Sequence, residues 1–344
     1  MPEDPIKHID FDDLNNRAIS QPLVKHIYTA DPSVHVFNGK IYIYPSHDIE
    51  NDIPFDDLGS HFAMEDYRVL SMDTPDSEVK DNGVALHVNE VPWADKQMWA
   101  PDVAEKDGTY YLFFPAKAYD GIFRIGVATG NSPVGPFIPE PEAIKGSFSI
   151  DPAVFKDDDG SYYMYFGGIW GGQLQRWRTG KFKSEGESPF MHLPGDNEPA
   201  LCAKVVRLSN NLLEFAEAPG DVIITDENDK PLLAGDNDRR FFEASWMHKY
   251  KGKYYFSYST GDTHFLCYAI GDNPYGPFKY AGKILEPVVG WTTHHAICEF
   301  KGKWYLFYHD SSLSKGITHL RSVKVTELTY DKEGKIQTIN PYRK

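Results

Sequence analysis

The chain has 344 residues, of which 41% are hydrophobic and 14% aromatic, enough for one large β domain or two smaller domains. Its 35 Lys and Arg against 50 Asp and Glu give a formal net charge of −15, and the absence of a basic stripe or polybasic run argues against a nucleic acid or an anionic membrane as partner. The three cysteines, Cys202, Cys267 and Cys298, have no paired spacing, so neither a disulfide framework nor a zinc ribbon is indicated.

The N-terminal residues 1–13 (MPEDPIKHIDFDD) have neither a basic start nor an apolar run. No later stretch reaches the roughly 20 apolar residues that a membrane-spanning helix needs. We therefore expect a soluble, cytoplasmic protein, unless a signal was removed before this numbering begins.

Five similar segments follow along the chain, and each runs from a short apolar strand through a Gly turn into an aromatic strand. In chain order they are ADPSVHVFNGKIYIY (30–44), WAPDVAEKDGTYYLFF (99–114), IDPAVFKDDDGSYYMYF (150–166), FEASWMHKYKGKYYFSY (242–258) and THHAICEFKGKWYLFY (293–308). Tyr, Phe, Trp and Ile on both sides of such turns are typical of β-hairpins.

The hairpins begin near residues 31, 100, 151, 243 and 294, which is the spacing of four-stranded propeller blades with insertions. A second element, GVATGNSPVGPF at 126–137 and YAIGDNPYGPF at 268–278, follows two of the hairpins and indicates a turn after a third strand. We therefore predict an all-β protein, with residues 1–344 forming a single five-bladed β-propeller. Two longer insertions, 47–99 and 171–240, are expected to be loops that either shape a pocket or form passive excursions on the surface.

Four of the five hairpins carry an ionisable side chain at one equivalent position, namely Asp31, Asp151, Glu243 and His294. In the second hairpin this position falls near Ala100, and Asp102 follows just after it. We expect Asp102 to support the blade. An Asp before Pro is by itself often only a turn residue, but its recurrence at a fixed point of the repeat indicates chemistry. Because the first strand of every blade lines the channel, we expect these side chains to meet on the axis. Three converging carboxylates match hydrolysis of a glycosidic bond, which needs an acid and a base.

The motifs TADPSV, WAPDV, SIDPAVF, EASW, THHAI and HLRSVKV, in this order and at propeller spacing, resemble glycoside hydrolase family 43, whose members are inverting glycosidases. The resemblance covers nearly the whole chain. It implies that Asp31 is the general base for water and Glu243 the general acid. It also implies that Asp151 raises the pKa of the acid and orients it, and that Arg321 contacts substrate hydroxyls or steadies the carboxylates.

The same resemblance implies a Ca²⁺ or similar hard cation in the channel, held through His294 and several waters, with no organic cofactor. The alternative for His294 is a neutral, hydrogen-bonded core histidine. Trp99, Trp170, Trp246 and Trp291 all lie near hairpin starts or loops, where an indole either stacks on a sugar or fills space between blades. Only Trp99, within the WAPD motif, is predicted to be a sugar platform.

We therefore predict an exo-acting, inverting glycosidase that releases single pentoses from xylo- or arabino-oligosaccharides. A β-D-xylosidase ranks first, and an α-L-arabinofuranosidase or endo-arabinanase is the alternative. A carbohydrate-binding propeller without catalysis would carry nearly equal sites on every blade, whereas the five positions differ here. A retaining fructan hydrolase is disfavoured because TADPSVHVFNG lacks an Asn-Asp-Pro-Asn-Gly type motif.

Overall fold

Four of the five predicted hairpins close through a two-residue turn in which both residues have positive φ. The turns are Asn38-Gly39, Asp107-Gly108, Lys251-Gly252 and Lys301-Gly302, with φ between 48° and 83°. Two consecutive residues with positive φ twist the turn in the same sense as the flanking strands, and glycine adopts this conformation without strain. The local sequence therefore favours pairing of the two strands on either side of each turn.

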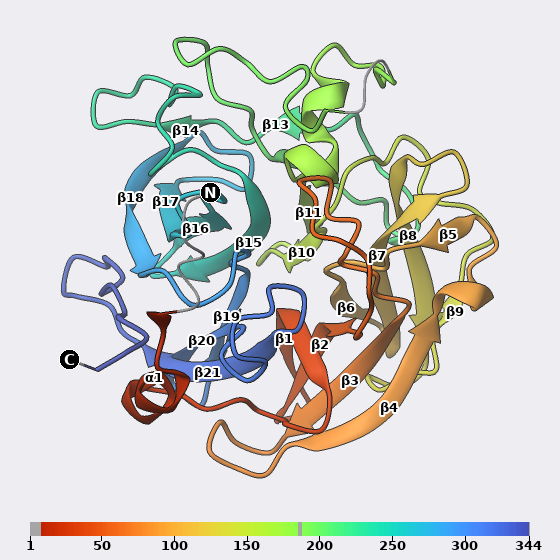
Figure 1. The fold of residues 1–344 in the computed structure, drawn as a ribbon. Coiled ribbons are helices and arrows are strands. Elements are labelled where there is room, and N and C mark those ends of the chain that lie inside the picture. Colours follow the sequence, from red (N-terminus) through yellow and green to blue (C-terminus); the bar gives the residue numbers. More distant parts are fainter. Residues whose placement is uncertain (1–7, 185–187, 344) are drawn as a thin grey trace.

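The structure, a computed structural model, describes residues 8–184 and 188–343, and its strands form five sheets around a central axis (Figure 1). Blade I contains β1 (Tyr28–Phe37), β2 (Lys40–Asp48), β3 (Asp66–Met72) and β4 (Lys80–His87). Blade II contains β6 (Asp102–Lys106), β7 (Thr109–Ala118), β8 (Phe123–Gly130) and β9 (Ile138–Pro139), with β5 (Ala94–Lys96) paired to β7. Blade III contains β10 (Ala153–Lys156), β11 (Tyr162–Phe166), β12 (Lys204–Arg207) and β13 (Gly220–Asp221).

Blade IV contains β15 (Glu243–Tyr250), β16 (Lys253–Ser259), β17 (Leu266–Gly271) and β18 (Phe278–Leu285), with β14 (Ile224–Thr225) parallel to β18. Blade V contains β19 (His295–Phe300), β20 (Lys303–Asp310) and β21 (Ser322–Leu328). The helices are α1 (Phe11–Arg17), before the first blade, and the 3-10 helices η2 (Val88–Glu90), η3 (Trp170–Gly172) and η4 (Leu174–Trp177). The predicted five-bladed propeller is confirmed.

The ring closes where the start of the chain meets its last blade. The segment leading into β1 runs beside β21, because the Leu23 N–H donates to the Val323 carbonyl (2.8 Å) and the Thr29 N–H donates to the Arg321 carbonyl (2.9 Å). Around the axis the first strands β1, β6, β10, β15 and β19 contact one another in turn (Figure 1). A position near the start of each first strand therefore lies near the same end of the channel.

The hydrophobic core lies between adjacent blades rather than at one centre. Buried apolar clusters fill the spaces between the blades, and a single cluster spans both the IV–V and the V–I spaces. The removal of one such side chain from water contributes about 1.5–3 kcal/mol. Representative pairs are Phe114 and Tyr67 between blades I and II, Phe113 and Met164 between II and III, Tyr165 and Phe256 between III and IV, and Val34 and Leu306 between V and I. Packing between blades fixes the first strands relative to one another, and this holds the channel residues in place.

The two segments predicted as insertions are partly blade structure. The segment 47–99 contains β3 and β4, and 171–240 contains β12 and β13, which are the outer strands of blades I and III. Their sequences lack the aromatic alternation of the hairpins, so the prediction treated them as loops and was wrong for these strands. Only the remaining parts, on either side of the strands, are available to shape a pocket.

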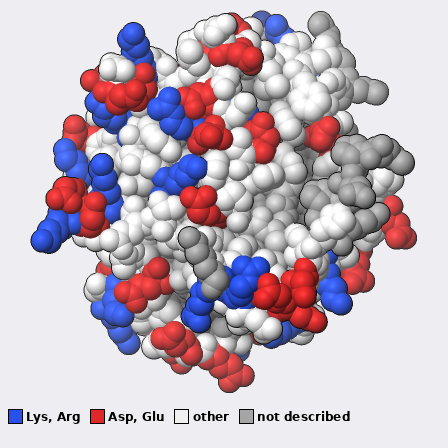
Figure 2. Space-filling model, turned by 60° about the vertical axis from the view of Figure 1, so that its left-hand side comes forward, with Lys and Arg blue, Asp and Glu red and all other residues white. Residues whose placement is uncertain are grey.

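The protein surface mixes charges of both signs. On the face shown in Figure 2, Lys and Arg side chains lie among Asp and Glu side chains and form no continuous basic stripe among the described residues. Such a stripe would be needed to follow a phosphate backbone. In the part of the chain that the structure describes, no helix is long and apolar enough to cross a membrane.

Candidate active site

A pocket opens on the propeller axis near the starts of the first strands. Its empty volume, including the part open to solvent, is about 660 Å³. Every blade contributes the residue that the repeat singled out to its lining: Asp31, Ala100, Asp151, Glu243 and His294. The predicted convergence of these positions is therefore present in the structure.

Two loops form one wall of the pocket. Residues 55–64, between β2 and β3, and residues 169–172, after β11, both line it. They touch at Gly171, where an added Cβ would lie 2.5 Å from the Leu58 carbonyl oxygen, so only glycine fits. The contact closes the pocket on this side, and these parts of the two predicted insertions do shape it.

Aromatic rings line the pocket on several sides. Trp99 lies against Phe62, to whose carbonyl its indole Nε1–H donates (2.8 Å), so the position predicted as a sugar platform is in the pocket. Trp170 and Trp291, which the sequence left open between sugar stacking and packing between blades, also line it, with ring centroids 5.4 Å apart. Trp246 instead packs in the core, where its Nε1–H donates to the Ile297 carbonyl (3.0 Å).

Asp31 is placed by a β-bulge in β1. The register to β2 shifts between Ala30 and Ser33, and Asp31 has a left-handed backbone with φ of 47°. Asp tolerates this conformation better than most residues, and a bulge commonly re-aims a side chain. The Asp31 carboxylate accepts hydrogen bonds from Ser46 Oγ (2.8 Å) and Arg321 Nη1 (2.8 Å). Both of its oxygens are thus held while the side chain faces the pocket.

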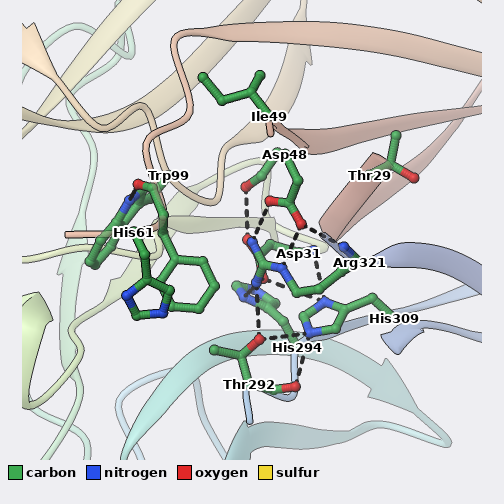
Figure 3. A network of polar contacts seen from close by, with 12 residues as sticks. Thr29, Asp31, Asp48, Ile49, His61, Trp99, Thr292, His294, His309 and Arg321 are labelled. Atoms are coloured by element: carbon green, nitrogen blue, oxygen red, sulfur yellow. Dashed lines mark hydrogen bonds and ion pairs between the residues drawn. The ribbon is translucent and has the colours of Figure 1, made fainter. Parts of the chain in front are cut away.

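Arg321 connects two buried acids at the pocket wall (Figure 3). Its Nε and Nη2 donate to Asp48 (2.8 and 2.7 Å), and its Nη1 donates to Asp31 and to Thr292 Oγ1 (3.0 Å). Its side chain is 3% exposed, and each of its three guanidinium nitrogens donates to a group of the protein. Sequence reasoning found Arg321 but not Asp48, because Asp48 belongs to none of the motifs and its pairing with Tyr28 depends on the bulge in β1. Steadying the carboxylates is the predicted role of Arg321 that this geometry favours.

Glu243 also lies at a bulge, but it is offset by one residue from Asp31. In blade IV the register shifts between Glu243 and Trp246, and the left-handed residue is Ala244, with φ of 63°. When the two bulges are aligned, Ala244 is equivalent to Asp31, and Glu243 is equivalent to Ala30. The prediction that Glu243 occupies the same repeat position as Asp31 was therefore wrong by one residue, because the hairpin pattern does not show where a strand bulges.

Asp151 lies directly before β10 and reaches the acid of the next blade. Its Oδ2 accepts a hydrogen bond from the Ala244 N–H (3.0 Å), next to Glu243, and its own φ is 57°. A backbone N–H favours the charged form of Asp151. Among the described residues, none donates a hydrogen bond to the Glu243 carboxyl, so no such contact stabilises its charged form.

Burial and charge move the pKa values of the pocket acids in opposite directions. Burial disfavours ionisation of Asp31, but the Arg321 guanidinium outweighs it and holds the pKa of Asp31 at about 2. Burial, reinforced by the charge of Asp31, raises the pKa of Glu243 to about 8. Burial, followed by the charges of Glu243 and Asp31, raises the pKa of Asp151 well above its usual range. At neutral pH the pocket therefore holds an ionised acceptor, Asp31, and a protonated donor, Glu243.

The raised pKa of Glu243 has a consequence for stability. The unfolded chain releases this proton near the ordinary pKa of 4.5, whereas the folded protein retains it up to about pH 8, so the free energy of unfolding should fall between these values. Glu243→Gln carries no such proton. Its unfolding midpoint should rise relative to wild type by at least about 2 °C between pH 4.5 and pH 8, as measured by scanning calorimetry. A difference in unfolding midpoint between the variant and wild type that is the same at every pH would contradict the raised pKa of Glu243.

His294 lies at the pocket floor beside the predicted base. Its Nδ1 is 3.6 Å from Asp31 Oδ1, and none of the described residues forms a hydrogen bond with its ring. Burial lowers the pKa of His294 to about 4, so the imidazole is neutral near pH 7 and keeps a lone pair for a metal. No group of three His, Cys, Asp or Glu residues able to hold a metal occurs within residues 8–184 and 188–343.

Asp102 joins three blades below the pocket. Its carboxylate accepts hydrogen bonds from His35 Nε2 (2.6 Å) and Ser33 Oγ of blade I and from the Val154 N–H (2.6 Å) of blade III. The residue is 1% exposed and is absent from the pocket lining. Its geometry matches the supporting role that the sequence predicted.

Comparison with known proteins assigns a family to this architecture. The family model described as Glycosyl hydrolases family 43 matches residues 20–336. Xylosidase/arabinosidase 43A of Humicola insolens is 61% identical over 325 residues, which cover 93% of this chain and 99% of that protein. A xylosidase/arabinosidase of Bacteroides ovatus is 62% identical over 318 residues, which cover 92% and 96%.

A solved structure shares both sequence and fold. It is a GH43 beta-xylosidase/alpha-arabinofuranosidase from a compost microbial metagenome, in complex with xylotriose and in a calcium-free form. It is 62% identical, superposes with a TM-score of 0.92, and the match covers 94% of this chain and 98% of that chain. The similarity therefore includes the whole propeller and not a single blade.

Proposed function

This chain belongs to glycosyl hydrolases family 43, and from that membership we propose that it is an exo-acting, inverting β-D-xylosidase acting on xylo-oligosaccharides. The predicted family and the predicted glycosidase class are confirmed. An α-L-arabinofuranosidase activity in the same pocket is the second candidate, because the similar proteins are described with both activities.

One observation supports the reaction type above all others: Asp31 and Glu243 line the same pocket, and of these two carboxyl groups only that of Asp31 accepts a hydrogen bond from Arg321. The guanidinium keeps the pKa of Asp31 low, at about 2, whereas burial raises the pKa of Glu243 to about 8. Glu243 gives its proton to the glycosidic oxygen as the bond from that oxygen to the anomeric carbon breaks. A water molecule forms the new bond to this carbon, and Asp31 takes the proton that the water loses. Attack from the face opposite the leaving group inverts the anomeric configuration.

The neighbours of these two groups fix their positions rather than react. Arg321 and Ser46 hold both oxygens of Asp31, so its free lone pairs can face only the pocket. Asp151 holds the Ala244 amide and thereby the backbone of Glu243. This supports the predicted orienting role of Asp151, and its negative charge, when present, favours the protonated form of Glu243.

Exo action is supported by the shape of the site. The loops 55–64 and 169–172 meet and close one wall, so the site is a pocket rather than a groove open at both ends. Trp99 and Phe62 line this pocket, and flat rings suit the faces of a pyranose. A pocket that admits one sugar releases single pentoses.

The function is tested with 4-nitrophenyl β-D-xylopyranoside, 4-nitrophenyl α-L-arabinofuranoside, xylotriose and linear arabinan. We expect the highest kcat/KM on the xyloside, stepwise release of xylose from xylotriose, and no release of oligomers from arabinan. Proton NMR of the first product should show α-xylose from the β-xyloside. Oligomer release from arabinan would overturn exo action, and β-xylose as the first product would overturn inversion.

We further propose that a hard divalent cation such as Ca²⁺ binds His294 through one imidazole nitrogen and is otherwise ligated by water. When bound, such a cation would favour the ionised form of nearby carboxylates. The Arg321 guanidinium, which also lies beside Asp31, provides a positive charge at this place without any metal. The effect of the cation on kcat should therefore be moderate.

Removal of the cation is expected to lower kcat by about tenfold, and His294→Ala should reproduce this loss and abolish the response to added Ca²⁺. The measurement is kcat on the aryl xyloside after EDTA treatment and after Ca²⁺ is restored. His26→Ala, which removes a largely exposed histidine far from the pocket, is the matched control. Unchanged activity in both EDTA and His294→Ala would leave His294 as a core histidine.

A further inference from the structure

The two bulges of the site share a structural problem. At each bulge a left-handed residue, Asp31 or Ala244, turns its backbone N–H out of the strand ladder. A buried N–H without a partner costs about 1–3 kcal/mol, and non-glycine residues in this conformation persist only where their surroundings hold them. The Ala244 N–H is bound by the Asp151 carboxylate. The Asp31 N–H is bound by His309 Nδ1 at 3.0 Å.

The hydrogen bonds of His309 define its tautomer. The Asp31 N–H can only donate, so Nδ1 accepts and carries no proton. Nε2 lies 3.0 Å from the Thr292 carbonyl oxygen, which can only accept, so the ring proton is on Nε2. Burial, followed by the nearby Arg321, lowers the pKa of His309 to about 3, in agreement with a neutral ring. His309 is 1% exposed and lies at the end of β20.

His309 therefore acts on the backbone of Asp31 and not on its carboxylate. Although Nδ1 is 3.5 Å from Asp31 Oδ1, it has no proton to give to that oxygen. The same ring is anchored to Thr292, whose Oγ1 accepts from Arg321 Nη1 (3.0 Å), and this nitrogen also donates to Asp31 (Figure 3). Residues of blade V thus hold both the backbone and the carboxylate of Asp31.

We propose that His309 is a positioning residue for the catalytic base: its Nδ1 holds the Asp31 amide in the left-handed bulge and so fixes the direction of the Asp31 carboxylate. The proposal rests on the proposed function, in which Asp31 activates water. His309 does for the base what Asp151 does for the acid, and it moves no proton during the reaction. Neither the hairpin repeat nor the carboxylate pattern marks it.

Two substitutions separate this role from simple core packing. In His309→Asn the side-chain carbonyl can replace Nδ1 as acceptor for the Asp31 N–H, whereas in His309→Gln the amide nitrogen replaces Nε2 as donor to Thr292 and the acceptor is lost. We expect His309→Asn to keep kcat within about tenfold of wild type, and His309→Gln to lose about 10²-fold with KM nearly unchanged, because a misplaced base slows the chemical step. His248→Asn and His248→Gln are matched controls, since His248 is also buried and neutral but is bonded to Tyr330.

The leaving group gives a second readout. Loss of base positioning should lower kcat by the same factor for aryl xylosides with good and poor leaving groups, because proton donation by Glu243 is intact. A loss confined to poor leaving groups, equal activity of His309→Asn and His309→Gln, or a higher activity of His309→Gln would overturn the proposal. Wild-type enzyme that cleaves none of the pentosides would instead refute the proposed function, so the two failures are distinguishable.

The wild-type protein provides a test that does not depend on whether the variants fold. With ¹⁵N-labelled histidine, NMR should show the His309 ring as a neutral tautomer protonated at Nε2 from pH 5 to pH 9. A ring protonated at Nδ1, or at both nitrogens at neutral pH, would exclude the hydrogen bond from the Asp31 amide and overturn the proposal.

Discussion

Glu243→Gln is expected to lower kcat on xylobiose by about 10²–10⁴-fold, the range that general acid catalysis contributes. The glutamine amide keeps the shape of the side chain but has no proton acidic enough to give to the departing oxygen. Activity on 4-nitrophenyl β-D-xylopyranoside should fall much less, because 4-nitrophenolate leaves without full protonation. The measurement is kcat of the variant and of wild type on each substrate. A much larger loss of kcat on xylobiose than on the aryl xyloside shows that the proton donor is missing.

The leaving-group dependence makes this result specific. Glu299→Gln, an exposed carboxyl on β19, is the matched control and should leave both rates within about twofold of wild type. A second expectation concerns pH: the decline of wild-type kcat/KM at high pH should be centred near pH 8, where Glu243 loses its proton, and it should be absent in Glu243→Gln. Equal losses on xylobiose and on the aryl xyloside would show that Glu243 is not the proton donor.

The fold was predictable because its main determinants are local and repeated. The turns at Asn38-Gly39 and Lys251-Gly252 adopt the positive φ that their glycines favour, and the aromatic strands on either side pair directly across them. Five such hairpins in one chain leave a propeller as the arrangement that covers both faces of every sheet. β3 and β12 were not predicted. Their sequences carry no distinctive strand pattern, and they form because they pack against the rest of their blades.

The site was predictable only as far as the repeat reaches. Asp31, Asp151 and His294 stand at comparable points of their blades, and the structure brings them together. The partners that set the properties of Asp31 are remote: Arg321 and His309 lie 290 and 278 residues away in the sequence. Their contacts arise from closure of the ring between blades I and V.

Asp48 and Thr292 were missed for the same reason. Neither belongs to a motif, and an Asp at the end of a strand or a Thr in a loop usually faces water. Only the position of the Arg321 guanidinium between them gives them a role, as acceptors of its remaining donors. The pKa of about 2 for Asp31 depends on this guanidinium, so it could not have been derived from the order of residues.

Asp31→Ala is expected to lower kcat by about 10²–10⁴-fold on xylobiose and on 4-nitrophenyl β-D-xylopyranoside alike. Without the carboxylate no group takes the proton of the attacking water, and this step is the same whichever group departs. The fold should survive, because Arg321 keeps its two side-chain hydrogen bonds to Asp48 and is not left as an unpaired buried charge. Asp158→Asn, which alters an exposed carboxylate outside the pocket, is the control and should remain active.

Azide provides the decisive form of this experiment, because it attacks carbon without having to lose a proton. In Asp31→Ala the removed carboxylate leaves space on the side from which water attacks, so azide should restore turnover of the aryl xyloside while having no such effect on Glu243→Gln with xylobiose. Attack from this side gives α-xylosyl azide, which NMR distinguishes from the β anomer. Formation of β-xylosyl azide would place the nucleophile on the wrong face, and near-normal activity without azide would remove Asp31 from the role of base. The outcome depends on Asp31 and Glu243 acting from opposite faces of one sugar, as the proposed inverting mechanism requires.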